Sequence, residues 1–518
     1  MTRQSLNPTA SAITSSGCST QDQSNNRFAL VLPGLMAFLL ALVPILGTSA
    51  RIPFLLVLVP LVLWSAFRDT ERAIYVYIAW CWMDGTIRGV FDSSPVAIVA
   101  RDIVMGVIVV GWAARRLQTR GDDPIRFPPT TLLVGLFVIL CILQLANPFS
   151  LGLVRSLAGL KVHLTPLPMF FLAYDVFRHR SQIRTLLLFL TLATLVIGAV
   201  SLVQYTQGRD WTWTHFPGTK EVISQNMHAS TVGAKLNSED LFKPPGTTGF
   251  GGGAGWFIGF VFPLPFCLLL LSGPMKFSKL FRIFFGGCLF AFILLIFING
   301  NRSSLVDALV CVLAFGMMTG GRLRVRTFTA ALACLGVGLF GWSLSQVISG
   351  GVTTDRFSSL FSDPIGALHN DRKTLFEEYG TIALNSPMGV GLGRIGAAAG
   401  HLGTASQHDD IGFSVFSEAY LGNMTFETGI IGAVLVSVIA ASFLWLGYRA
   451  LQALREPDDR LLASALLSVL LTLVLNFVVV SILLGPPGSI LYWLCAAVLL
   501  RVFLPPTAAR VQGIKQKG

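Results

Sequence analysis

Apolar runs of about 20 residues, the length that crosses a bilayer as a helix, recur along the chain between shorter polar segments. We therefore predict an all-α polytopic membrane protein with about 12 to 14 transmembrane helices. The predicted spans are residues 28–47, 52–67, 73–91, 96–114, 131–149, 160–177, 183–205, 254–272, 280–298, 303–320, 326–347, 416–448, 462–484 and 488–504.

Two long polar intervals, residues 206–253 and 348–415, interrupt this pattern. Loops of that length are typical of functional segments rather than connectors. The intervals divide the chain into membrane groups and tails. The membrane groups are residues 28–205, 254–347 and 416–504, and the tails are residues 1–27 and 505–518. The first tail is rich in Ser, Thr, Asn and Gln, which predicts a disordered segment.

Lysine and arginine residues predict the orientation, because short cytoplasmic loops retain positive charge. If the amino terminus lies inside, every predicted inner segment contains at least two of the 38 basic residues, whereas the opposite orientation breaks this pattern. We therefore predict that both termini are cytoplasmic and that both long polar intervals are large periplasmic loops.

Composition excludes several function classes. With 53% apolar residues, 12% charged residues and a mean hydropathy of +0.68, the chain belongs in a bilayer. The inner segments explain the net charge of +12, so we predict no nucleic-acid partner. The chain contains no P-loop, Cys-x-x-Cys or His-Glu-x-x-His motif, and we predict neither a metal nor a cofactor. Most of its eight cysteines lie in apolar runs, which favours packing residues over disulfides.

Several basic residues lie at or just below the predicted outer face, against the charge bias. They are Arg51, Arg88, Arg101, Arg155, Lys161 and Arg302. Cations in this position suit a phosphate ligand. Two of them have an alternative interpretation. Arg101 could form an ion pair with another helix, and Arg302, which begins a span, could extend its side chain to the interface.

An ordered set of short motifs over about residues 240–450 resembles the O-antigen ligase and polymerase superfamily of bacterial inner-membrane glycosyltransferases. The motifs are Lys243-Pro244-Pro245-Gly246-Thr247, Asn301-Arg302-Ser303-Ser304, Asp355-Arg356-Phe357, Asp371-Arg372, the run from Asn385 to Gly393, Tyr420-Leu421 and the run from Glu427 to Gly432. The combination and its order carry the resemblance.

The resemblance implies metal-independent transfer of a glycan from a polyprenyl pyrophosphate carrier to a sugar hydroxyl, on the periplasmic side of the inner membrane. The implied partners are this lipid-linked glycan, the lipid bilayer, and a chain-length regulator and a flippase of the same pathway. The residues fit independently, because a membrane-bound diphosphate needs cations at the outer interface. Trp211, Trp213 and Phe216 in the first interval suit either a sugar chain or anchoring at the interface.

The resemblance also implies roles for individual residues. Arg356 and Arg372 match family arginines that would stabilise the departing diphosphate, or they could hold the loop together by pairing with nearby aspartates. Ser417-Glu418 stand where ligase-type members carry a His-Asn pair, so the sequence departs from the family pattern here. Glu418 could act as the general base or hold the acceptor, and His401 and His408 are alternative bases. The predicted substrate-binding residues are Arg302, Lys243, Arg101, Arg394, Tyr420 and Glu427.

Some of these residues also have a structural interpretation. The glycines of the run from Asn385 to Gly393 let backbone approach a ligand or simply turn the chain, and we favour the turn. Tyr420, Asn423 and Glu427 share one helix face, so Glu427 either lines a cavity or satisfies the start of a helix.

The Ser417-Glu418 replacement and the two large outer loops favour a polymerase, which joins lipid-linked repeat units into O-antigen, capsule or exopolysaccharide. The first alternative is a ligase that transfers the glycan to a lipid or protein acceptor. A lipid-linked oligosaccharide flippase is an alternative of another class, although the repeated halves typical of transporters are not visible. An assembly subunit without enzymatic activity also fits the topology.

Overall fold

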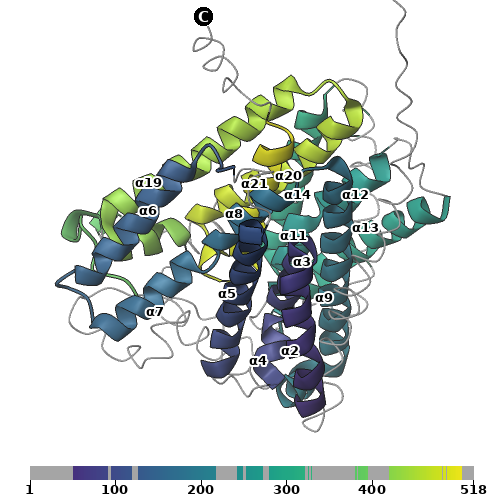
Figure 1. Cartoon of the computed structure of the whole chain (residues 1–518). Helices are drawn as coiled ribbons and strands as arrows, with labels where there is room; N and C mark the ends of the chain where they lie inside the picture. Colours follow the sequence, from purple (N-terminus) through teal and green to yellow (C-terminus); the bar gives the residue numbers. More distant parts are fainter. Residues whose placement is uncertain are drawn as a thin grey trace, which may run out of the picture.

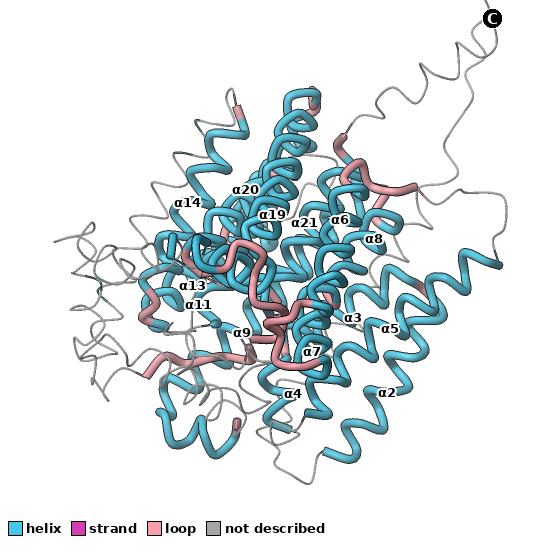
Figure 2. Tube along the Cα trace, turned by 90° about the vertical axis from the view of Figure 1, so that its left-hand side faces the viewer, coloured by secondary structure: helices cyan, strands magenta, loops and turns pink. Residues whose placement is uncertain are grey.

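The computed structural model describes a helical protein (Figure 1; Figure 2). The described residues are 51–90, 95–118, 126–216, 242–248, 253–271, 279–320, 380–381, 383–394, 419–480, 482–485 and 487–504, with single positions at 325, 328, 343 and 357. These residues contain no strand, which confirms the all-α prediction for this part of the chain.

The main helices follow one another along the chain with short 3-10 segments, marked η, between some of them. In order they are α2 (Arg51–Arg68), α3 (Thr70–Trp82), α4 (Asp84–Val90), α5 (Pro95–Gln118), α6 (Thr131–Leu143), η2 (Gln144–Ala146), α7 (Leu153–Leu164), α8 (Leu167–Val176), α9 (Arg180–His215), α11 (Gly253–Val261), α12 (Pro263–Leu270), α13 (Lys279–Asn299), α14 (Arg302–Thr319), α19 (Tyr420–Ala453), α20 (Pro457–Leu475), η5 (Asn476–Val478), η6 (Ile482–Leu484) and α21 (Gly488–Val502).

Seven helical segments of the described chain are long and apolar enough to cross a membrane. They are Leu153–Val176, Arg180–His215, Gly253–Leu270, Lys279–Asn299, Arg302–Thr319, Tyr420–Ala453 and Pro457–Val478. Two shorter apolar segments cover Thr131–Ala146 and Gly488–Val502. The chain is therefore a multi-pass membrane protein. The total of 12 to 14 spans and the orientation stay predictions.

The core is formed by helices that are distant in sequence. Helix α14 contacts α11 and α20, α21 contacts α8 and α20, and α9 contacts α11, α12 and α13. Gly255 and Gly259 allow the close approach of α11 to α14, since an added Cβ would lie 2.8 Å from Ser304 Oγ or from the Ser304 carbonyl oxygen of α14. The six cysteines within the described ranges are buried free thiols, which confirms them as packing residues.

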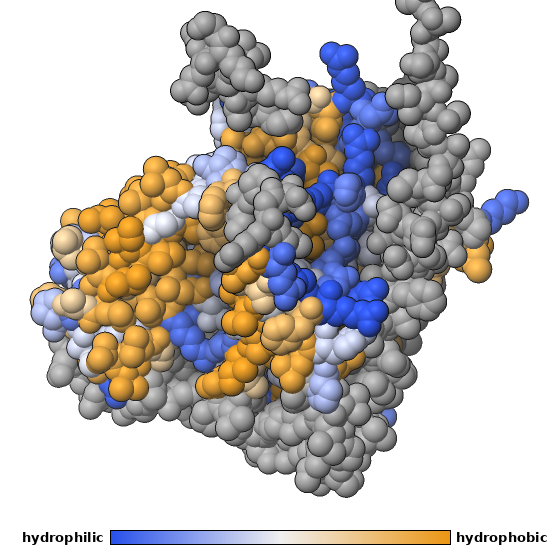
Figure 3. All heavy atoms as spheres, in the orientation of Figure 1, coloured by the Kyte–Doolittle hydropathy of each residue, from blue (hydrophilic) through white to orange (hydrophobic). Residues whose placement is uncertain are grey.

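One side of the molecule presents a broad apolar surface. Helix α19 runs beside α6 (Figure 1), and apolar atoms cover this left-hand part of the molecule (Figure 3). Its exposed side chains include Leu132 and Ile139 of α6 and Val434 and Trp445 of α19. Exposed apolar area of this extent is what lipid chains cover in a membrane protein.

Several helix boundaries differ from the predicted spans. Helix α9 was expected to end at residue 205, but it continues to His215 after a break at Gly208, where φ is 87°. Trp211 and Trp213 are therefore helical, with Trp211 stacked on His215 at 4.2 Å between ring centroids. The predicted span at residues 254–272 is two helices, because Pro263 begins α12 and cannot continue the hydrogen bonds of α11.

Candidate functional site

The glycine-rich run forms a tight loop at residues 386–394. Gly389, Gly391 and Gly393 have positive φ angles of 78°, 90° and 82°. A Cβ at Gly391 would lie 2.9 Å from Ser150 Cβ, and a Cβ at Gly393 would meet the backbone carbonyl oxygen of Arg155. Only glycine combines these angles with such close backbone packing. The glycines therefore turn the loop and let it pack against Ser150 and the first turn of α7.

This loop pairs with a break in α19. Gly429 has a φ of 75° and interrupts the helix, which leaves backbone groups without their helical partners. The loop supplies new ones. Val390 N donates to Phe426 O at 2.8 Å, and Ile430 N donates to Pro387 O at 3.0 Å. We call residues 386–394 together with residues 426–430 the glycine joint.

Glu427 holds the glycine joint together. Its Oε1 accepts hydrogen bonds from the backbone N–H groups of Gly393 at 2.9 Å and Arg394 at 3.0 Å. Its Oε2 lies 2.8 Å from Nε2 of His163 on α7. The Glu427 side chain is 3% exposed and that of His163 is 2% exposed. A buried carboxylate with these three partners positions the loop, rather than forming the wall of an open cavity.

Two amide side chains add a second connection between α6 and the glycine joint. Gln144 Nε2 donates to Met388 O at 2.9 Å, and Asn147 Nδ2 donates to Gly389 O at 3.0 Å. The two side chains also contact each other, since Asn147 Nδ2 donates to Gln144 Oε1 at 2.7 Å. Because the bonds go to backbone carbonyl groups, they fix the path of the loop.

The glycine joint places two arginines close together. The Arg394 side chain donates to the carbonyl oxygen of Phe149, and its Nε is buried with no hydrogen-bond partner in the described part of the chain. Burial lowers the pKa of Arg394, and the positive charge of Arg155 lowers it further. Two half-buried guanidinium groups that repel each other favour the binding of an anion nearby.

Ion pairs connect α7 with α5 and α4. Lys161 Nζ lies 2.5 Å from Asp102 Oδ2, and Arg101 Nε lies 3.5 Å from Asp102 Oδ1. Asp84 of α4 lies 3.6 Å from Arg101 Nη1 and 2.7 Å from Arg88 Nη2. Arg101, which is 9% exposed, thus has carboxylates on two helices. It forms the interhelical ion pair that was one of its two predicted interpretations.

The polar contacts continue to the segment that contains Lys243. The Thr247 carbonyl oxygen accepts a hydrogen bond from Gly85 N at 2.8 Å. Gln204 of α9 binds both backbone groups of Gly246, donating to its carbonyl oxygen at 2.9 Å and accepting from its N–H at 2.7 Å. Lys243 therefore lies in a segment anchored on α4 and on α9 just before its break at Gly208.

The turn that leads to Arg302 also contacts α9. Asn299 Nδ2 donates to Ser201 Oγ at 2.9 Å, which joins α9 to the turn before α14. Trp256 Nε1 donates to Ser303 Oγ at 2.6 Å next to Arg302. These contacts and those above follow one another from α19 through α7, α5, α4 and α9 to the turn before α14, and we call the residues that make them the polar belt. Its members are Glu427, His163, Lys161, Asp102, Arg101, Asp84, Thr247, Gly246, Gln204, Ser201 and Asn299.

The predicted site residues thus fall into two sets. Arg101, Lys243, Arg302, Arg394 and Glu427 lie in the polar belt or directly beside it. Tyr420 is 5% exposed and packs edge to face on Phe477, with ring centroids 5.1 Å apart, so it belongs to the core. The remaining three, Arg356, Arg372 and Glu418, lie outside the described residues.

Sequence reasoning missed two contributors to this site, His163 and Gln144, and did not predict the neighbour of a third. His163 carried a signal, because an ionisable residue inside an apolar run has a functional or pairing role by default. Gln144 lies in a predicted span and gave a weaker signal of the same kind. Arg155 had been counted among the outer cations, but nothing in the sequence indicated that it lies beside Arg394.

Comparison of the chain with family models, with curated proteins and with solved structures finds no match. The described residues also contain no group of three or more His, Cys, Asp or Glu side chains that would hold a metal ion. The functional argument therefore rests on the belt, whose cations could bind an anionic ligand and whose carboxylates are already engaged with protein groups.

Proposed function

We propose that the chain is a membrane glycosyltransferase that polymerises polyprenyl-pyrophosphate-linked oligosaccharide repeat units into a cell-surface polysaccharide, on the outer face of the bacterial inner membrane. The observation that carries the proposal is the juxtaposition of Arg155 and Arg394 at the glycine joint. A diphosphate between two guanidinium groups receives charge-assisted hydrogen bonds and cancels their repulsion.

In the proposed reaction, an acceptor sugar hydroxyl attacks the anomeric carbon of the donor. The bond from that carbon to the carrier diphosphate breaks, and Arg155 and Arg394 stabilise the negative charge of the departing diphosphate. We assign the proton of the hydroxyl to Glu418 and further diphosphate contacts to Arg356 and Arg372. Glu427 is a positioning residue, because its oxygens hold the Arg394 amide and His163.

A second group of cations supports polymerisation over ligation. A polymerase binds two carrier-linked glycans and needs two diphosphate sites. Arg394 lies in the glycine joint next to Arg155, whereas Lys243 and Arg302 belong to segments that are bonded to α9 before its break at Gly208. The Arg101 ion pairs separate the two groups. We assign the second carrier to Lys243 and Arg302.

The test is the reaction of purified protein in liposomes with lipid-linked repeat units alone. Arg394→Ala should reduce the ladder of longer lipid-linked glycans by more than about tenfold, or about 1.4 kcal/mol of transition-state stabilisation. Arg394→Lys should recover little of it, because lysine lacks the planar fork. Arg449→Ala, at an exposed position of α19, is the matched control and should leave the ladder unchanged.

One result would overturn diphosphate binding by these arginines, and another would replace polymerisation with ligation. An unchanged ladder for both Arg394→Ala and Arg155→Ala would remove these arginines from diphosphate binding. A mixture that stays unreacted until a lipid A core or another acceptor is added, and then gives a single transfer, would establish a ligase.

Orientation is tested separately with fusions to the full chain. A fluorescent protein after Gly518 should fluoresce, and a periplasmic phosphatase near Ala405 should be active. The reverse result would place the polar belt on the cytoplasmic side and exclude a periplasmic reaction.

A further inference from the structure

A second group of charged residues lies at the opposite end of the same helices. Along α5, Arg101 of the polar belt and Arg116 are separated by about 22 Å at 1.5 Å per residue. Around Arg116 the ends of α2, α5 and α8 meet the starts of α3 and α9 and enclose a cavity of about 360 Å³. Arg68, Arg115, Arg116 and Arg178 line it, and we call it the arginine pocket.

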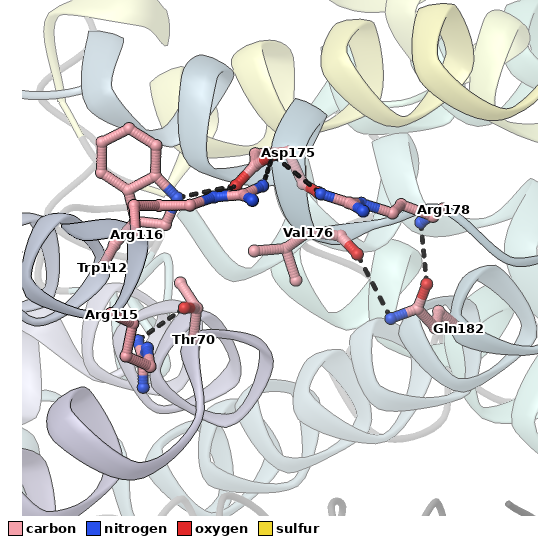
Figure 4. Close-up of polar contacts among 8 residues, drawn as sticks. All are labelled: Thr70, Trp112, Arg115, Arg116, Asp175, Val176, Arg178 and Gln182. Carbon is pink, nitrogen blue, oxygen red and sulfur yellow. Dashed lines mark hydrogen bonds and ion pairs between the residues drawn. The ribbon is translucent and has the colours of Figure 1, made fainter. Parts of the chain in front are cut away.

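The inner wall of the arginine pocket is fixed by one carboxylate. Asp175 lies between Arg116 and Arg178 (Figure 4). It accepts hydrogen bonds from Arg116 Nε at 2.8 Å, from Arg178 Nη2 at 3.0 Å and from Trp112 Nε1 at 2.8 Å. Gln182 completes the wall by accepting from the backbone N–H of Arg178 at 2.8 Å. Asp175 is 5% exposed, so its charge is directed at these groups rather than at the mouth of the pocket.

The other two acidic residues of the pocket are hydrogen-bonded to groups other than its arginines, and Asp69 also attracts Arg115. Asp69 caps α3 by accepting from Glu71 N at 2.9 Å, and it pairs with Arg72 at 3.3 Å, outside the lining. Burial raises the pKa of Glu71, which precedes the apolar part of α3, and hydrogen bonds from Gln182 and Tyr75 offset part of that rise. Four arginines line the pocket, and its three acidic residues already form the hydrogen bonds described above. The pocket is therefore positively charged.

Arg68 stands toward the open side of the pocket, whereas Arg115 is half-buried. Arg68 is exposed, with its guanidinium 5.2 Å from the centre of the Trp64 ring. Arg115 donates to Thr70 Oγ1 at 2.5 Å, which aims the planar group along the start of α3.

Apolar side chains lie next to this charged mouth. Phe67 is 53% exposed and Leu117 is 63% exposed, and each is the chain neighbour of a pocket arginine. Trp64, at 43% exposed, lies one turn before Arg68 on α2. A ligand with a phosphate group and an acyl chain would match both surfaces, whereas a free phosphate would use only the charged one.

We propose that the arginine pocket binds the phosphate head group of an anionic phospholipid, with the acyl chain along α2. Under the predicted orientation this pocket faces the cytoplasmic leaflet, and basic pockets between helices on that side are suited to such head groups. The inference is independent of the proposed glycosyl transfer, which concerns the other end of the helices.

The experiment measures lipid retention by native mass spectrometry after the full chain is released from nanodiscs containing equal parts of phosphatidylglycerol and phosphatidylcholine. The wild type should retain phosphatidylglycerol about tenfold or more over phosphatidylcholine. Arg68→Gln/Arg115→Gln should reduce this preference to about twofold or less, since two charges near the head group are lost. Arg449→Gln/Arg455→Gln removes two exposed charges elsewhere and should keep the wild-type preference.

Three outcomes would overturn the inference. They are the absence of a preference in the wild type, an equal loss in both double variants, and displacement of the lipid by glycerol phosphate at millimolar concentration, which would identify a soluble phosphate ligand. Arg68→Glu is a second variant at an exposed side chain and should fold normally. It should lower the preference at an unchanged thermal midpoint, and a wild-type preference in that variant would also contradict the proposal.

Discussion

The polar belt and the arginine pocket lie at opposite ends of α3, α5 and the α7–α8 pair, yet they use charge differently. In the belt, each carboxylate joins two elements. Asp102 joins α5 to α7, Asp84 joins α4 to α5, and Glu427 joins the glycine loop to α7. In the pocket, one of the three acidic residues, Asp175, holds two arginines, and Arg68 is exposed at the open side.

This difference distinguishes residues that position the site from residues that bind a ligand. A buried carboxylate bonded to backbone N–H groups and to a second helix sets the geometry of the site, and its loss destabilises the fold. Arginines at the mouth of an open pocket contribute little to folding, because water and salt screen them. Variants of the belt should therefore change stability, whereas variants of the pocket mouth should change ligand binding.

The largest effect is expected at Gly393. Gly393→Ala places a side chain at a φ of 82° against the Arg155 carbonyl oxygen, so we expect a cost of about 3 kcal/mol or more and little folded protein. The measurement is the folded fraction of a fluorescent fusion in size-exclusion chromatography. Gly152→Ala is the matched control, with a φ of 100° and no atom within 4 Å of the added Cβ. It should cost about 1 kcal/mol, and equal losses would mean that the joint is not tightly packed.

The second-largest loss of stability is expected at Glu427. Glu427→Ala leaves two backbone N–H groups and His163 without their acceptor in a buried place, at a cost of about 3 kcal/mol. Glu427→Gln keeps a carbonyl oxygen for the two N–H groups and should cost about 1 kcal/mol. Thermal midpoints in detergent measure both. If the two variants were equally destabilised, the charge of Glu427 and not its hydrogen bonds would hold the joint.

A smaller loss of stability is expected when an ion pair of the polar belt is removed. Asp84→Ala removes one carboxylate from Arg88 and Arg101, but Asp102 still compensates Arg101. We expect a cost of about 2 kcal/mol. Because Arg101 is buried, this cost should be nearly the same in 0.1 M and 1 M salt. A loss that disappears at high salt would show that the pair is solvated.

The pH dependence of stability tests the environment of Glu71 in the arginine pocket. Its pKa is raised in the folded chain, so its contribution to stability is present at low pH and is lost as the pH rises through the folded pKa. Glu71→Gln removes the titrating group and should flatten this part of the stability curve, with a modest gain above that pKa. Thermal midpoints over a pH series provide the measurement, and parallel curves for the two proteins would contradict the assignment.

The smallest effect is expected for the Arg72–Asp69 pair at the edge of the pocket. The two side chains are 22% and 41% exposed, so Arg72→Gln should cost about 0.5 kcal/mol, and less in 0.5 M salt. Thermal midpoints at two salt concentrations test this. A cost comparable to that of Asp84→Ala would mean that the two ends of the bundle do not differ as described.

Much of this organisation followed from the sequence. Long apolar runs predicted membrane helices, and the structure contains seven segments with that length and composition in its described ranges. The glycine run predicted a turn, and three of its glycines have positive φ angles. Both inferences succeed because burial in lipid and backbone freedom depend on the residues at a position and on their near neighbours.

The partners of the charged residues were decided by the tertiary structure. The sequence left Arg101 between an ion pair and an anion site, and only the packing of α4 against α5 brought Asp84 to it. Glu427 and His163 are 264 positions apart, and the break at Gly429 is what opens α19 to the glycine loop. An ion pair or hydrogen bond needs two groups within about 3 Å, and that distance depends on how whole helices pack, which local sequence patterns do not encode.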